Sequence, residues 1–117
     1  MIYTGYYGRL NEYEEAGLTP VAISGQAPCW FEGYHFPFLG PSLDIFTKWK
    51  NKEITDQQYV DRFIPERLEK LDKTDLKRQL EMIDNPILLC YEKEGFCHRH
   101  IVAAWIEQNL GLEVKEY

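Results

Sequence analysis

The sequence predicts a small three-layer α/β domain, with a short, mainly parallel sheet flanked by helices. Three observations predict this class: four short β-prone segments, a continuously apolar one at residues 86–91, and helical patterns between them. A continuously apolar strand suits a parallel sheet covered on both faces. Strands interleaved with helices are typical of α/β folds. A chain of 117 residues fits one domain, which we place at residues 1–117.

The expected strands occupy residues 2–4, 20–24, 86–91 and 112–115 in chain order. Gly5 and Gly25 close the first two, as turn-forming residues do. The fourth alternates between apolar and polar side chains, which places it nearer an edge of the sheet.

Helical patterns fill most of the chain between residues 42 and 83. Ser42 can cap a short helix with Leu43, Phe46 and Trp49 on one face. A capping-box pattern at residues 55–58 starts a second helix. Pro65 should kink or split it, because proline lacks an N–H and clashes with the preceding turn.

Two more helices complete the pattern. Thr74 can cap a segment that turns Leu76, Leu80 and Ile83 inward. The last helix runs from about residue 97 to residue 110. Gly111 stands at the position just after it, where glycine is favoured.

The charge balance narrows the classes of function. Lys and Arg number 13 against 19 Asp and Glu, a formal net charge of −6. This acidity argues against a broad nucleic-acid or anionic-membrane surface, because phosphate affinity comes mainly from basic residues. A local basic site stays open.

The sequence also bears on the cellular location. It contains no run of about 18 apolar residues and no signal peptide, so we expect no membrane span and a cytoplasmic protein. Three unevenly spaced cysteines do not make a disulfide framework. Free thiols in a reducing cytosol are therefore the expectation.

Ligands of open parallel sheets bind outside the carboxyl ends of the strands, and this rule selects three loops. They cover residues 5–9, 25–30 and 90–99. In the third, Cys97 falls where the final helix should begin, close to Cys90 and Glu92 in sequence. The helix dipole there favours an anion and lowers the pKa of a thiol, as neighbouring His98 and Arg99 also would.

Two interpretations of this loop stay open. In one, Arg99 and the helix N-terminus hold an anion. Cys97 is then the candidate nucleophile, with Glu92 or His98 as acid or base. In the other, Cys97 is a small buried residue and Arg99 pairs with Glu92 or Glu94.

A metal site is a competing interpretation. Cys90, Cys97, His98 and His100 are all zinc-ligand types, and Cys29 could add another from the neighbouring loop. The spacing argues against zinc: there is no Cys-x-x-Cys pair, and the two histidines point to different sides of a helix. We therefore predict no metal and no cofactor.

Further candidates lie at the pocket rim. Arg9 follows a glycine-rich turn and could bind an anion, or it could be a solvated arginine beside Glu12. Gln26 and Tyr34 are polar groups in an otherwise apolar stretch, and either could orient a ligand. Cys29 belongs to the same loop region.

Residues 88–93 followed by Cys97-His98-Arg99 resemble the signature of the domain-of-unknown-function family 488. In that family, a strand ending in Leu-Cys-x-Glu leads to Cys-His-Arg at a helix start. Residues 2–5 are similar to the family's opening strand, and residues 48–63 to its middle helices. The resemblance implies a fold and a site but no reaction. The family's Asp-Val-Arg at the second strand is replaced by Ala22-Ile23-Ser24, for which Gln26 and Arg9 are candidate substitutes.

The leading hypothesis is a pocket that binds, or acts on, a small anionic or nucleotide-like ligand, with Cys90 near its centre. The alternative is a non-catalytic interaction module that uses aromatic N-terminal loops, including Trp30 and Phe36, to bind a protein partner. A nucleic-acid accessory role through Arg9, Arg99 and Lys93 is opposed by the net charge.

Overall fold

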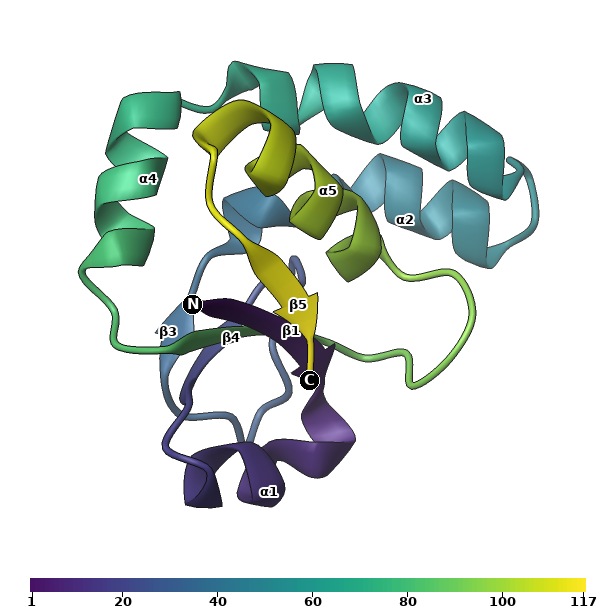
Figure 1. The fold of residues 1–117 in the computed structure, drawn as a ribbon. Helices are drawn as coiled ribbons and strands as arrows, with labels where there is room; N and C mark the ends of the chain where they lie inside the picture. The colour runs from purple at the N-terminus through teal and green to yellow at the C-terminus, as the bar shows by residue number, and fades with distance from the viewer.

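A computed structural model describes all 117 residues and contains a five-stranded parallel sheet (Figure 1). The strand order is β3-β2-β4-β1-β5, and every pair of neighbours is parallel. The strands are β1 (Ile2–Tyr6), β2 (Thr19–Ala22), β3 (Tyr34–His35), β4 (Pro86–Cys90) and β5 (Val114–Glu116). The sequence predicted all of these strands except β3. That strand is only two residues long and both residues are exposed, so no apolar run marks it.

Helices cover both faces of the sheet, which confirms the predicted three layers. Figure 1 shows α1 (Leu10–Glu15) on one side and the other four helices on the opposite side. Those four are α2 (Leu43–Lys50), α3 (Asp56–Glu66), α4 (Lys73–Glu81) and α5 (His98–Leu110). None of the helices is long and apolar enough to cross a membrane.

The position of strand β4 at the centre of the sheet explains its apolar sequence. All five of its residues are buried. Leu88 belongs to the larger core under α2–α5, whereas Ile87 and Leu89 belong to the smaller core beneath α1. Side chains alternate between the faces of a strand, so a strand with a core on each side needs an apolar residue at every position.

The predicted caps of two helices are confirmed. The Ser42 hydroxyl accepts a hydrogen bond from the N–H of Ile45 at 3.2 Å, and Thr55 forms a capping box with Gln58. The split expected at Pro65 is confirmed: α3 ends one residue later, at Glu66, and a separate 3-10 helix, Leu68–Lys70, follows. Proline removes one helical hydrogen bond and clashes with the preceding turn, so a helix does not continue far beyond it.

The predicted N-cap of α4 was wrong, whereas the predicted glycine at the end of α5 is confirmed. The N-cap of α4 is Asp72 rather than Thr74; its carboxylate accepts from the N–H of Asp75 at 3.0 Å. Gly111 ends α5 in the left-handed conformation (φ 68°), as predicted. Only glycine adopts this conformation without a steric penalty from Cβ.

Candidate functional site

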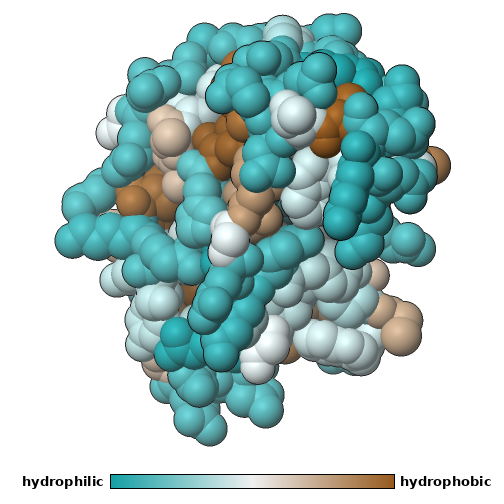
Figure 2. All heavy atoms as spheres, turned by 90° about the vertical axis from the view of Figure 1, so that its right-hand side faces the viewer, coloured by the Kyte–Doolittle hydropathy of each residue, from teal (hydrophilic) through white to brown (hydrophobic).

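A pocket of about 790 Å³ lies where β2 and β4 end and α2 and α5 begin. This volume is in the usual range for small-molecule sites. Figure 2 looks onto the side of the molecule toward which the strands run, where small apolar areas lie between hydrophilic side chains. The lining residues are Ser24, Gly25, Gln26, Pro37, Pro41, Ser42, Leu43, Phe46, Trp49, Tyr59, Arg67, Tyr91, Glu92, Phe96, Cys97 and His98.

Aromatic rings form one wall of the pocket. The ring of Trp49 lies 5.4 Å from that of Phe96 and 6.4 Å from that of Phe46, and Tyr59 and Phe96 are 4.9 Å apart. The Trp49 indole donates to the carboxylate of Asp56 at 2.8 Å, which fixes the ring. The sequence correctly placed Phe46 and Trp49 on one face of α2, and the structure shows that this face lines the pocket.

The core contact of α2 is made by another residue. Ile45 is fully buried, whereas Leu43 is 80% exposed. A helix this short can point one side chain into the core and still offer a second apolar stripe to a pocket.

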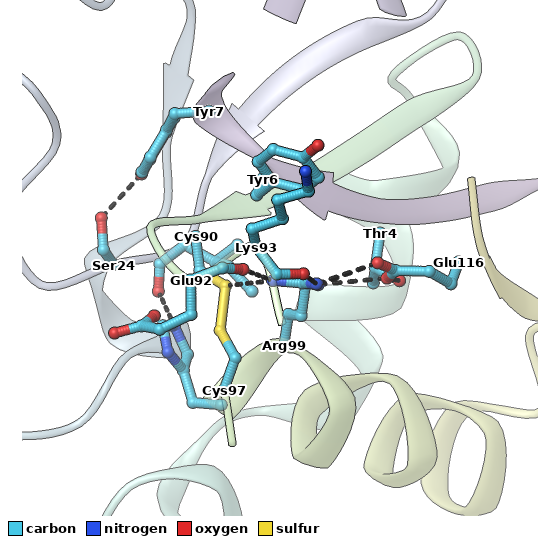
Figure 3. Close-up of a disulfide and its surroundings, with 12 residues drawn as sticks. Thr4, Tyr6, Tyr7, Ser24, Cys90, Glu92, Lys93, Cys97, Arg99 and Glu116 are labelled. Carbon is cyan, nitrogen blue, oxygen red and sulfur yellow. Dashed lines mark hydrogen bonds and ion pairs between the residues drawn. A yellow bond between two sulfur atoms is a disulfide. The ribbon is translucent and has the colours of Figure 1, made fainter. Parts of the chain in front are cut away.

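Cys90 and Cys97 form a disulfide, so the expectation of free thiols was wrong for these two residues (Figure 3). Cys90 ends β4, and Cys97 is the N-cap of α5. The loop between them turns back on itself and brings the sulfurs together, which an odd cysteine count does not reveal. Cys29 is the free cysteine, and it is exposed. Since a disulfide has no thiol, the nucleophile hypothesis for Cys97 applies to the reduced protein alone.

His98 is buried beside this disulfide. Its Nε2 lies 2.8 Å from the carbonyl oxygen of Ile23, at the end of β2. Burial lowers the pKa of His98 to about 4; the bond to Ile23 opposes this shift, and nearby Arg99 adds to it. The imidazole is therefore uncharged at neutral pH.

Arg99 does not reach the pocket. Its side chain is 2% exposed and pairs with the carboxylate of Glu116 on β5 at 2.9 Å. It also donates to the carbonyl oxygens of Glu92 and Lys93 and lies 3.0 Å from the sulfur of Cys90. Figure 3 shows these bonds converging on the guanidinium. The structure therefore makes Arg99 a tie between the 90–97 loop and β5, with Glu116 in place of the acidic partners considered from sequence.

The remaining predicted residues divide into two groups. Gln26 and Glu92 line the pocket with Cys97 and His98. Arg9 does not line the pocket, and it forms an exposed ion pair with Glu12 at 2.6 Å.

Tyr34 and Cys29 also lie outside the pocket. Tyr34 is on edge strand β3 and is exposed, and Cys29 is exposed on the loop after β2. Cys90 lies behind the pocket wall, fully buried.

Sequence reasoning missed Arg67, a cation in the pocket wall just after α3. It donates to the carbonyl oxygens of Gly40 at 3.0 Å and Pro37 at 3.2 Å, and it forms no ion pair. In the sequence it is one of many charges between residues 48 and 81, and no local pattern distinguishes it.

Ser24 was also missed. Its hydroxyl lies 2.7 Å from that of Tyr7 and donates to the carbonyl of Gln26 at 2.9 Å. Burial raises the pKa of Tyr7 to about 12, although the bond to Ser24 opposes the shift. The phenol therefore stays protonated, and the pair holds the β2 loop at the pocket edge.

Residues 20–110 match the sequence model of a known family, described as the active DUF488-N3 subclade. The chain belongs to this family. The match covers the Cys90–Arg99 motif and thus confirms the resemblance drawn from sequence. No curated protein and no solved structure gives a significant match.

The DUF488-N3 motif forms one connected cluster in this chain. The two cysteines bond to each other, His98 bonds to the end of β2, and Arg99 bonds to β5. Where family 488 has Asp-Val-Arg, this chain uses Ile23 and Ser24 for contacts to His98 and Tyr7. The motif thus ties the ends of three strands around the pocket.

Proposed function

We propose that the pocket of this DUF488-N3 protein binds a small ligand that joins a planar ring to an anionic group, as a nucleotide does. The observation that carries the proposal is Arg67, which borders the pocket without a carboxylate partner. The other arginines considered for this role, Arg9 and Arg99, are already paired with glutamates.

Arg67 is suited to an anion because part of its hydrogen-bonding capacity is free. Its Nε and Nη2 are held by backbone carbonyls, and its Nη1 makes no hydrogen bond within the protein. Those carbonyls orient the side chain without neutralising its charge. An oriented guanidinium of this kind is a strong group for phosphate or carboxylate recognition.

Two helix N-termini add to the positive character of the pocket. Ser42 and Leu43 bring the start of α2 to the lining, and Cys97 and His98 bring the start of α5. Free backbone N–H groups at helix starts attract anions.

The rest of the lining suits the planar part of such a ligand. The rings of Phe46, Trp49 and Phe96 offer apolar surface, and Trp49 is held in place by Asp56. Glu92 supplies a carboxylate acceptor on the same pocket, which favours a ring with N–H donors.

Isothermal titration with the four common ribonucleoside monophosphates, their nucleosides and inorganic phosphate tests the proposal. We expect at least one monophosphate to bind more tightly than both its nucleoside and phosphate. Arg67→Gln should weaken that binding about ten-fold or more, the loss expected for one charged hydrogen-bond donor. Arg78→Gln, on exposed α4, is the matched control and should change nothing. Absence of binding by all four, or equal loss in both variants, contradicts the proposal.

A protein-interaction role has one observation in its favour: Trp30 is 57% exposed, and its ring and that of exposed Tyr91 both pack against Tyr7. Phe36, the other aromatic considered, is buried, so its substitution would test folding instead. A photo-crosslinking residue at Trp30 should capture one specific protein in cells, and the same residue at exposed Met82 should not. The same set of captured proteins at both positions argues against this role.

A further inference from the structure

Three side chains of metal-ligating type converge at the wall of the pocket. One ligand atom each from Cys90, Cys97 and His98 lies within 4.8 Å of the others, and all three residues are buried. Around a tetrahedral zinc ion, with bonds of about 2.0–2.3 Å, ligand atoms lie roughly 3.3–3.8 Å apart. The required adjustment is small once the disulfide is reduced. The sequence identified these residues as zinc-ligand types, but their spacing predicted no metal; strand β4 and helix α5 bring them together despite it.

The histidine has one ring nitrogen that is free to bind a metal. A carbonyl oxygen can only accept a hydrogen bond, so Nε2 of His98 carries the proton it donates to Ile23. Nδ1 then has the lone pair, and the hydrogen bond to Ile23 does not engage it. Zinc-bound histidines characteristically donate their other ring N–H to a carbonyl or carboxylate in this way.

The surroundings of the sulfurs suit two thiolates. The guanidinium of Arg99 donates to Cys90 Sγ at 3.0 Å and would stabilise its negative charge. Two thiolates, one neutral imidazole and one divalent cation sum to zero charge. A buried cluster of that composition avoids the penalty of an uncompensated charge.

We propose that in the reduced protein Cys90, Cys97 and His98 bind one zinc ion or a similar thiophilic divalent ion. A phosphine reductant converts the disulfide to two thiols while it gains an oxygen from water, whose two protons pass to the sulfurs. Each thiol then releases its proton as its sulfur binds the ion. The fourth coordination position faces the pocket, because Cys97 and His98 line it.

The test titrates Co²⁺ and Zn²⁺ into metal-free protein reduced with a phosphine. We expect one Co²⁺ per chain with thiolate-to-cobalt and tetrahedral absorption bands, displaced by one equivalent of Zn²⁺. Oxidised wild-type protein should bind neither ion, and this control requires no substitution. Azide should shift the cobalt bands by binding at the fourth position; no shift would overturn the open position.

Variants separate the site from incidental thiol binding. Cys97→Ser and His98→Gln should each weaken Zn²⁺ binding at least ten-fold. Cys29→Ser and His100→Gln change the exposed cysteine and an exposed histidine, and both should bind as wild type does. The proposal is overturned by equal Zn²⁺ binding in the oxidised and reduced proteins, or by unchanged affinity in His98→Gln. None of these measurements uses a nucleotide, so the result is independent of the proposed ligand pocket.

Discussion

At the scale of single residues, the ion pair of buried Arg99 with partly exposed Glu116 holds the motif loop to the sheet. Arg99 is 2% exposed, whereas Glu116 is 43% exposed and also accepts from the hydroxyl of Thr4 at 2.6 Å. The pair connects α5 to β5, which are also joined by a hydrogen bond from the N–H of Val114 to the carboxylate of Glu107.

Glu116→Gln should lower the free energy of unfolding by about 1–3 kcal/mol, because it leaves a buried guanidinium without its counter-charge. The loss stays below that of a fully buried pair, since Glu116 is partly solvated and Arg99 keeps two carbonyl acceptors. Urea denaturation at pH 7 measures the change. Glu113→Gln removes an exposed pair with Lys115 and should cost less than about 0.5 kcal/mol. Equal effects in the two variants would contradict the role of burial.

The same pair predicts a pH dependence. Partial burial raises the pKa of Glu116, but hydrogen bonds from Arg99 and Thr4 outweigh it and hold this pKa below its usual value. An acid with a depressed folded-state pKa stabilises the fold above its unfolded pKa, about 4.3, and loses that contribution as the pH falls through the folded pKa. The stability difference between wild type and Glu116→Gln should therefore be constant from about pH 6 to 8 and shrink below about pH 4. A difference that grows on acidification would contradict this assignment.

At the scale of elements, a close approach of two backbone segments shapes the pocket. A Cβ on Gly40 would lie 2.8 Å from both the N of Gly25 and the O of Ile23. Those atoms belong to the loop after β2, which cannot withdraw without moving the pocket wall.

Gly40→Ala should therefore destabilise the protein by about 1–3 kcal/mol, as overpacking does, and should also weaken ligand binding. Gly25→Ala is the matched control across the same contact, because its Cβ would meet its nearest neighbour, the O of Pro41, at 3.6 Å. Thermal unfolding of both variants measures the effect. If Gly25→Ala is as destabilising as Gly40→Ala, the close approach is not the cause.

The sequence was informative where local chemistry decides structure. Ser42, Thr55 and Gly111 marked helix ends correctly, because caps depend on neighbouring residues alone. The apolar run of β4 correctly indicated a covered parallel strand. Short β3 carried no such signal, since it is a strand only through its hydrogen-bonded pairing with β2 and has no apolar run of its own.

The contacts of the site residues were harder to predict from the sequence. The sequence identified the motif loop, but the partner of Arg99 lies 17 residues away on the last strand. The position of the Arg67 side chain likewise depends on where α3 ends relative to residues 37–40, whose carbonyl oxygens hold it. Contacts between distant segments follow from packing of the whole chain, and no spacing within one sequence specifies them.

At the scale of the whole molecule, the disulfide joins the central strand to the helix that packs across the sheet. Its loop is short, with a sequence separation of 7 between Cys90 and Cys97. A cross-link stabilises chiefly by restricting the unfolded chain, and a loop of this length contributes about 2–3 kcal/mol in that account.

Reduction with a phosphine in the presence of a metal chelator should therefore lower the Tm by on the order of 10 °C for a domain of this size. Calorimetry of the oxidised and reduced proteins measures the shift. Cys29→Ser should show the same shift, because the exposed cysteine takes no part in the bond. Cys97→Ser should show none, since it has no disulfide to reduce. An identical Tm before and after reduction of the wild type would mean that β4 and α5 are held together by Arg99, His98 and the core without help from the cross-link.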